Sequence, residues 1–280
     1  MSPSHRLLLA FSISLVQACV PAPALPPAGA AATAPTAAAA DARAGLLMRA
    51  DGAFARRAEI AQAQHAVTAW EQALGDREDR DLHLRLARAR YFLGLASEGD
   101  ARRAHFERGA EHALRAWWPA GASADECAAA QAHAEAAPLF WRAANLAELA
   151  REHGIVEGAS ARALAVCLAE RAVALQPELF HGGPLRLLGR LLASLPALSG
   201  GDLARSRTLL EAAVARAPEF LQNRVDLAAY WAVKAQDRRA FESALRAVLA
   251  APDGDAAIAP ENALARRRAQ ALLERADVLF

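Results

Sequence analysis

Three stretches in the second half of the chain share one spacing of small or apolar residues ahead of a proline. In each stretch the positions follow one another at intervals of four, three and five residues. Residues at i, i+4 and i+7 lie along one face of an α-helix, and small side chains there let a neighbouring helix approach closely. The pattern predicts helices that pack in pairs, each pair ending at a proline. The three sets are Ala165, Ala169, Ala172 and Pro177; Ser206, Leu210, Ala213 and Pro218; and Ala240, Ala244, Ala247 and Pro252.

The intervals between these prolines predict the type of repeat. Pro218 and Pro252 are 34 residues apart, which is the period of the tetratricopeptide repeat, a pair of antiparallel helices. The interval from Pro177 to Pro218 is 41 residues, and we place the extra residues in 196–201. An alanine-rich helical chain can yield such matches by chance, but here three stretches agree. Since one hairpin cannot bury its apolar face alone, we expect an all-α fold of tetratricopeptide-like helical hairpins stacked as a superhelix with a concave surface.

The composition also favours helices. The chain has only four Ile and four Thr, whereas the strong helix formers Ala, Leu, Arg and Glu dominate. The expected helix starts carry recognised signals: Asp202 and Asp237 as N-caps, Ser123 with Glu126 as a capping box, and Pro138 and Pro260 in first turns. Amphipathic patterns predict helices near 42–74 with a break around Gly52, and near 80–97, 101–117, 124–136, 139–153, 159–175, 184–195, 202–217, 220–235, 238–250 and 260–278.

The first 40 residues differ from the rest of the chain. Residues 1–18 are typical of a signal peptide, with a short positive start and an apolar stretch too short to span a bilayer. Residues 15–19 (Leu-Val-Gln-Ala-Cys) resemble the lipobox of bacterial lipoproteins, in which the cysteine, here Cys19, is cleaved free and lipidated. The alternative is an ordinary secreted protein with a cysteine there by chance. Residues 19–40 carry no charge and are rich in proline and alanine, which predicts a flexible linker before a helical-repeat domain over 41–280.

No sequence motif points to catalysis. The chain contains no HExxH, GxSxG, Walker or GxGxxG motif, so we predict no enzymatic activity, no cofactor and no metal site. His133 and Glu135 are two residues apart, which directs them to different faces of a helix. The 32 basic and 31 acidic residues are interspersed, and Lys234 is the only lysine. This balance gives no electrostatic basis for binding nucleic acid, and it leaves the lipid as the membrane attachment.

Several residues are candidates for ligand binding, each with a structural alternative. Arg186 and Arg190 lie on the inner stripe of a repeat helix, where they either grip a ligand or are simply solvated. Trp141 and Asn145, one turn apart, either face a cavity or pack in the core. His181 precedes two glycines and is either functional or an ordinary loop histidine. Cys127 and Cys167 either form a disulfide, which an exported compartment permits, or remain free, with Cys167 packing as a small apolar residue.

A series of short segments in order along the chain resembles the T-component (TatT) family of tetratricopeptide-associated TRAP transporters. The likeness covers roughly 100–280, is strongest after 177, and is poor over 42–100. The segments are Phe106–Gly109, Leu139–Trp141, His181–Gly189, Leu195 and Pro196, Gly200–Asp202, Asn223, Ala228–Tyr230, Gln236 and Asp237, Phe241, Leu245, Glu261 and Asn262, Ala265, and Ala269–Leu273. The resemblance implies a periplasmic lipoprotein that forms a homotrimer, partners a periplasmic solute-binding protein and has a pore suited to a small organic, hydrophobic ligand.

The leading hypothesis is therefore a lipid-anchored repeat protein that helps to deliver an organic solute to a TRAP-type transporter. Its groove or pore would be lined by Trp141, Asn145, His181, Arg186, Arg190 and Asn223. Val20, directly after the lipidated cysteine, is compatible with the outer membrane. One rival is a general scaffold lipoprotein whose concave face binds a protein segment during envelope assembly. The other is an enzyme whose site matches no known motif.

Overall fold

A computed structural model describes residues 36–118, 125–154, 158–252 and 254–280, and the expected signal peptide, Cys19 and most of the linker lie outside them. The chain divides into two compact units, Met1–Ala40 and Asp41–Phe280. In the described part of the first unit, Thr36 caps the start of a helix, with its hydroxyl accepting a hydrogen bond from the amide of Ala39 (3.3 Å).

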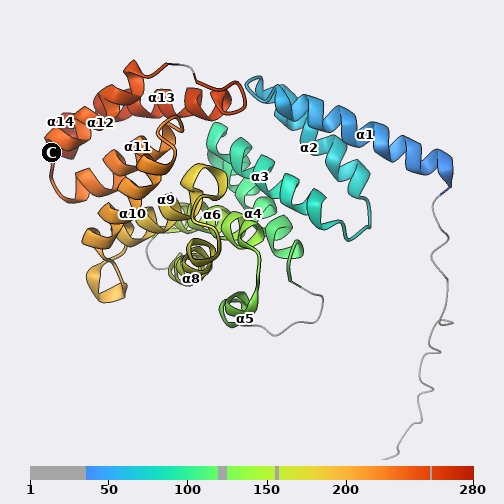
Figure 1. The fold of residues 1–280 in the computed structure, drawn as a ribbon, viewed down its shortest axis with the longest axis horizontal. Helices are drawn as coiled ribbons and strands as arrows, with labels where there is room; N and C mark the ends of the chain where they lie inside the picture. Colours follow the sequence, from blue (N-terminus) through green and yellow to red (C-terminus); the bar gives the residue numbers. More distant parts are fainter. Residues whose placement is uncertain (1–35, 119–124, 155–157, 253) are drawn as a thin grey trace, which may run out of the picture. The chain divides into compact units, whose positions relative to one another are not determined.

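The described residues form helices and contain no strand, so the prediction of an all-α fold is confirmed (Figure 1). One helix continues from a short α-helical segment, Gln222–Asp226, into a π-helical turn, Leu227–Ala232. The elements are α1 (Ala37–Ala55), α2 (Ile60–Leu74), α3 (Arg80–Ala96), α4 (Gly99–Arg115), α5 (Glu126–Ala132), α6 (Ala136–Glu152), α8 (Ala159–Leu175), α9 (Leu179–Ser194), the 3₁₀ turn η1 (Ala197–Ser199), α10 (Leu203–Arg216), α11 (Gln222–Asp226), the π turn η2 (Leu227–Ala232), α12 (Arg238–Ala250), α13 (Ala259–Leu273) and α14 (Ala276–Leu279).

Several helices break or end at other residues than predicted. The break in the first long helix lies at residues 56–59, not at Gly52, which is within α1. The helix predicted over 124–136 ends at Ala132, because His133 adopts an extended conformation and a new helix begins at Ala136. The last predicted helix is interrupted after Leu273.

Aspartates cap several helix starts. The Asp202 and Asp237 carboxylates each accept a hydrogen bond from the amide three residues later (both 2.8 Å), as predicted. The cap of α5 is Asp125, which accepts from the amide of Ala128 (2.9 Å), whereas the predicted cap Ser123 lies outside the described residues. These caps fix where the second helix of two successive hairpins starts.

The repeat pattern is confirmed in two stretches and shifted by one residue in the third. The small or apolar residues of α8 and α10 that share the spacing are fully buried. In α12 the buried residues are instead Phe241, Leu245 and Val248, and Ala247 is exposed. The reason is the N-cap: Asp202 and Asp237 are 35 residues apart, so counting from the caps aligns Ser206 with Phe241. The helix start sets the register, not the proline that follows the helix.

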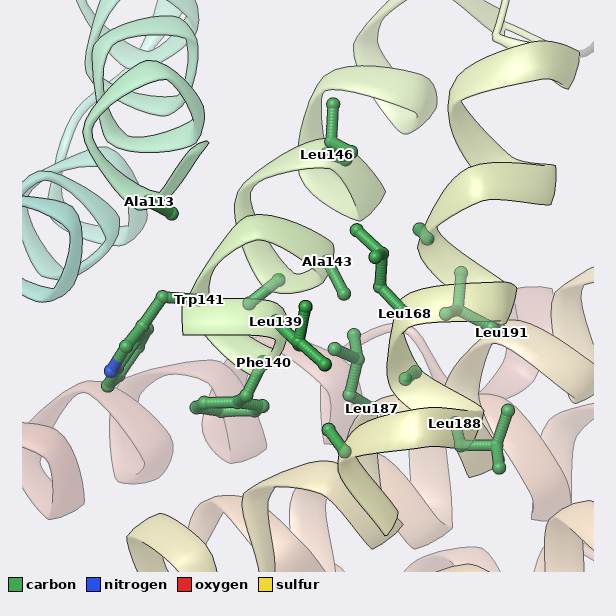
Figure 2. Packing of buried hydrophobic residues seen from close by; sticks show 14 of the residues in the cluster. Ala113, Leu139, Phe140, Trp141, Ala143, Leu146, Leu168, Leu187, Leu188 and Leu191 are labelled. Atoms are coloured by element: carbon green, nitrogen blue, oxygen red, sulfur yellow. The ribbon is translucent and has the colours of Figure 1, made fainter. Parts of the chain in front are cut away.

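The largest part of the core lies between α6, α8 and α9. Leu139 and Ala143 of α6 point toward Leu168 of α8 and Leu187 of α9, while Trp141 leaves α6 on another side (Figure 2). Small residues allow this close packing: a Cβ atom at Gly183 would lie 2.6 Å from the ring of Phe140. The tight core holds the inner helices α6 and α9 in a fixed relation to each other.

The two ends of the helical array in the second unit touch each other (Figure 1). Arg57, in the turn between α1 and α2, donates through Nη2 to Oε2 of Glu261 at the start of α13 (2.7 Å) and also bonds the carbonyl of Ala257. Arg88 of α3 lies 3.7 Å from the same carboxylate, and Leu264 packs against the cluster of α1, α2 and α3. Residues about two hundred positions apart are thereby joined.

Cys127 of α5 and Cys167 of α8 form a disulfide, with their Cα atoms 5.9 Å apart, which settles the alternative left open by the sequence. Within the described residues, no helix combines the length and the apolar character that crossing a bilayer requires.

Candidate functional site

Charged residues line the inner side of the array, on helices that are far apart in sequence. On α6, Trp141, Asn145 and Glu148 follow one another at intervals of four and three residues and so lie on one face. Arg186 and Arg190 of α9 lie on the corresponding face of the next hairpin, and all of these side chains are buried. Buried charges are costly unless they are paired, so their partners decide what this surface can do.

Glu148 and Arg190 form the central ion pair. Nη2 of Arg190 donates to Oε1 of Glu148 at 2.6 Å, and both side chains are almost completely buried. Nη2 of Arg102 and Nη2 of Arg151 approach the other carboxylate oxygen of Glu148 at 3.2 and 2.9 Å. Burial alone would raise the pKa of Glu148, but the three guanidinium groups outweigh this effect and lower the pKa from 4.5 to about 2. Glu148 is therefore ionised throughout the physiological range.

Asp226, at the end of α11, is a second buried acid that holds several arginines. Its Oδ1 accepts hydrogen bonds from Nη1 of Arg268 (2.7 Å) and Nε2 of Gln222 (2.8 Å). Its Oδ2 lies 3.6 and 3.8 Å from the Nε atoms of Arg186 and Arg190. Burial lowers the pKa of Arg186, and Asp226 partly restores it. Asp226 thus joins α9, α11 and α13 electrostatically.

Two cavities open beside this network. The larger, of about 540 Å³, lies between α6, α9 and η2, and the second, of about 470 Å³, lies between α3, α6 and α13. Arg151, Arg190 and Tyr230 line both, and the hydroxyl of Tyr230 accepts a hydrogen bond from Nη2 of Arg190 at 3.1 Å. Cavities of this size are in the range that binds small molecules.

A narrow aromatic slot lies near the second cavity. Trp141, Phe180 and Phe220 line it together with Arg88 and Arg186. The ring centroids of Trp141 and Phe180 are 4.9 Å apart, and the Arg186 guanidinium carbon lies 5.0 Å from the ring of Phe220. Only about 30 Å³ of this slot is open, so it holds no solute without movement of an aromatic ring.

The start of α9 has an unusual backbone. Phe180, His181 and Gly182 all have positive φ angles of 46°, 58° and 75°. For the two non-glycine residues this conformation costs on the order of 1–3 kcal/mol each and must be held by its surroundings. Nδ2 of Asn223 holds it by donating to the carbonyl of His181 (3.0 Å), while its Oδ1 accepts from Arg186 (2.8 Å).

The structure places the predicted site residues in three environments. Arg190 lines both cavities, and Trp141 and Arg186 line the aromatic slot. Asn223 is fully buried among backbone carbonyls, and His181 is half-buried with its ring stacked on Phe220. A binding role for each of these residues stays a prediction.

Asn145 packs between helices. It is fully buried, its Nδ2 donates to the carbonyl of Trp141 (2.8 Å), and a Cβ atom at Gly109 of α4 would lie 2.3 Å from its Oδ1. Asn145 thus makes the contacts of a residue packed between two helices. Of the two alternatives for this position, they agree with packing in the core.

Five residues of the site are not among those predicted from the sequence: Glu148, Asp226, Arg151, Tyr230 and Lys234. The sequence does carry a signal for Glu148, since this acid continues the stripe of Trp141 and Asn145 by one more turn of the helix. Lys234 is distinctive in the sequence only as the single lysine, and the structure places it in the lining of the larger cavity. Asp226 has no such signal, because its role depends on a neighbour 42 residues away.

A family model described as TRAP transporter T-component matches residues 60–280, which is most of the chain. The match begins earlier than the likeness seen from the sequence, so α2 and α3 are part of it. A search of curated proteins gave no match.

Proposed function

The chain belongs to the TRAP transporter T-component family, and from this we propose that it binds an organic solute on its inner surface and presents it to a periplasmic solute-binding protein. The observation that supports this proposal most directly is the pair of cavities that meet at Arg190, which we assign to the concave side expected of stacked hairpins. Stacked helical hairpins commonly use this side for binding. The role is one of non-enzymatic transport assistance.

The proposal includes a place in the cell. The lipobox predicted at residues 15–19 would leave Cys19 as a lipidated N-terminus, and the proline-rich linker would hold the helical domain away from the membrane. We propose that the protein is anchored in this way in the periplasm, at the outer membrane, and that it forms a homotrimer.

Anchoring is tested by replacing the lipidated residue. In the native cell, Cys19→Ala should move the protein from the membrane fraction to the soluble periplasmic fraction, and metabolic labelling with a fatty-acid analogue should disappear. Cys127→Ser together with Cys167→Ser is the matched control, because it removes the other two cysteines and leaves the lipobox intact. Membrane attachment that persists in Cys19→Ala would contradict lipid anchoring.

Partner binding is tested by affinity capture of the tagged, membrane-extracted chain from its native cell, followed by mass spectrometry. Recovery of a periplasmic solute-binding protein would support the proposal. Arg151→Gln alters a half-exposed cavity residue and should reduce the amount of co-purified small molecule, whereas Arg239→Gln, on the exposed side of α12, should not. Recovery of envelope-assembly proteins alone would favour a general scaffold lipoprotein instead.

A further inference from the structure

Two pairs of polar side chains join α3 to α4. On α3, His83 and Arg90 are seven residues apart, and so are His105 and His112 on α4. Residues at i and i+7 lie on one face of a helix. The contacts run in antiparallel order, because His83 meets His112 and Arg90 meets His105. Together with Glu71 of α2, these four residues form what we call the polar seam.

Glu71 connects the polar seam to a third helix. Its carboxylate accepts a hydrogen bond from Nη2 of Arg90, and its Oε1 lies 3.9 Å from Nε2 of His112. His112 and Arg90 outweigh the effect of burial and lower the pKa of Glu71 from 4.5 to about 2. Glu71 is therefore ionised wherever a histidine titrates.

The contact between His83 and His112 tolerates only one positive charge. Their Nδ1 atoms lie 2.9 Å apart, so one of them must carry the proton that the other accepts. When both rings are protonated, both Nδ1 atoms are donors, and the two N–H groups repel each other. His83 is almost completely buried, and its Nε2 has no hydrogen-bond partner among the described residues. Charging this ring is therefore costly in the closed structure.

The second pair requires a neutral histidine. Nη1 of Arg90 lies 3.1 Å from Nδ1 of His105. An arginine only donates, so Nδ1 of His105 must be free of a proton in order to accept. A proton on this nitrogen removes the acceptor and places a second cation beside Arg90. Both pairs of the polar seam are thus weakened by protons.

Charged groups around His83 act on its pKa in opposite directions. Burial, His112 and Arg115 of α4 lower the pKa, whereas Glu78 and Asp79, which precede α3, raise it. Burial is the largest effect, and the pKa of His83 lies below the usual value of 6.5.

The pKa of His105 is lowered for the same reason. Burial is again the largest effect, Arg90 and Arg108 of α4 add to it, and Glu71 opposes it. The pKa of His105 therefore also lies below 6.5 in the folded protein.

The sign of the pH dependence follows from these two shifts. The helix α6 also packs on α4, but its acids Glu148 and Glu152 bind Arg102 there and not a histidine. Since His83 and His105 bind a proton less readily in the folded protein, acid favours states in which the polar seam is open. The stability that the polar seam provides is complete above about pH 6.5 and is lost as the pH falls below this value.

We propose that the polar seam is a pH-sensitive contact that holds α3 against α4 in neutral solution and loosens in acid. The two helices also line the second cavity through Tyr91 and Arg102, so loosening changes one wall of that cavity. The inference concerns the fold itself and does not depend on the proposed transport role.

Hydrogen exchange of the purified full-length chain near pH 7.5 and pH 5 tests the inference. The rates are converted to protection factors, which correct for the intrinsic effect of pH on exchange. Each proton bound only in the open state lowers protection by up to about thirtyfold between these pH values. We expect protection at residues 83–93 and 105–113 to fall at least about fivefold more than in α12. No such difference between these residues and α12 would overturn the inference.

A double variant assigns the effect to the histidines. His83→Asn with His105→Asn removes both titrating groups and keeps both hydrogen bonds, because an amide can donate to His112 and accept from Arg90. Residues 83–93 and 105–113 should then be protected equally near pH 7.5 and pH 5. His65→Asn, at an exposed position of α2, is the matched control and should retain the full acid response. An acid response that persists in the double variant would contradict the role of these histidines.

Titration of the unaltered protein gives a test that needs no variant to fold. In ¹⁵N NMR spectra, the rings of His83 and His105 should take up protons only below about pH 6.5. The signals of His83 and His112 should change together, because the two rings share one hydrogen bond. Titration midpoints above pH 6.5 for His83 and His105 would overturn the inference.

Discussion

Glu148 shows how a single buried carboxylate can organise the inner surface. It holds Arg190, Arg102 and Arg151, which come from α9, α4 and α6. Its pKa of about 2 in the folded protein, against 4.5 in the unfolded chain, corresponds to about 3 kcal/mol of stability. Because the folded pKa is the lower one, this contribution is fully present above pH 4.5 and is lost as the pH falls toward 2.

We expect Glu148→Gln to lower the free energy of unfolding at neutral pH by roughly 3–5 kcal/mol, because it leaves Arg190 buried without its main partner. The difference from the unaltered protein should shrink as the pH falls from 4.5 toward 2. Denaturant titrations at several pH values measure both effects. Glu211→Gln, which breaks an exposed pair with Arg207, is the control and should change the stability by less than about 0.5 kcal/mol.

Asn223 is a case in which a predicted binding residue has a visible structural task. Its Nδ2 lies within hydrogen-bonding distance of the carbonyls of His181, Ala213 and Ala217, and its Oδ1 accepts from Arg186. Asn223→Ala removes all of these hydrogen bonds from a fully buried position, and we expect a loss of about 2 kcal/mol of stability.

Thermal unfolding measures that loss, and solute binding measured well below the melting temperature separates the two roles. If Asn223 only supports the turn at residues 180–182, ligand affinity should fall little once the variant is folded. A large loss of affinity with unchanged stability would instead place Asn223 in direct contact with the ligand.

At the level of elements, the short helix α5 is held in place by a covalent bond to α8. It has only seven residues, and it is joined to α8 by the disulfide between Cys127 and Cys167 and to α6 by the paired bonds of Arg142 to Glu126. The disulfide closes a loop of 40 residues, for which the chain-entropy relation gives about 4 kcal/mol of stabilisation.

We expect a reductant to lower the melting temperature and to speed hydrogen exchange first in residues 126–132. Differential scanning calorimetry and hydrogen exchange with mass spectrometry measure these effects. The double variant Cys127→Ser and Cys167→Ser should show the lower melting temperature without reductant and no further change with it. An unchanged melting temperature on full reduction would contradict a stabilising role.

The helices were largely predictable, and the reasons for the misses are local. The sequence correctly placed Asp202 and Asp237 as caps, because an N-cap is recognised within one turn. It misplaced the register of α12 by one residue, since the proline after the helix was used for alignment instead of the cap before it. The sequence also did not predict the π turn at 227–232. A π turn contains one extra residue, and the composition of this segment is that of an ordinary helix.

The candidate site was less predictable than the helices. The spacing of Arg186 and Arg190 predicts that both lie on one face of their helix, and both side chains are buried. Their partners Glu148 and Asp226 come from other hairpins. The periodic pattern of one helix does not show which residues of another helix will contact it. The three-dimensional structure was therefore needed to show that these two arginines are buried in ion pairs and are not solvated at the surface.

At the scale of the helical domain, the contact between its ends is held by few residues. Glu261 is largely buried between Arg57 and Arg88. We expect Glu261→Ala to leave Arg57 as an unpaired buried cation and to open this contact, with a stability loss of roughly 3–5 kcal/mol. Hydrogen exchange should speed up at residues 54–63 and 257–264 together.

Small-angle X-ray scattering on the same variant should show a larger radius of gyration. Glu274→Ala, at the exposed end of the same helix, is the control and should leave both measurements unchanged. Faster exchange at only one of the two segments would mean that Arg57 and Glu261 do not join the ends in solution.

The contact between Arg57 and Glu261 also has a consequence for how the protein folds. Open arrays of helical hairpins lose their repeats one after another, because each hairpin interacts only with its neighbours. Here the first and last hairpins also stabilise each other, so neither end can fray independently and the array should unfold in a single cooperative step. During synthesis the opposite holds: Arg57 emerges long before Glu261, and the N-terminal hairpin stays without its final partner until nearly the whole chain has been made.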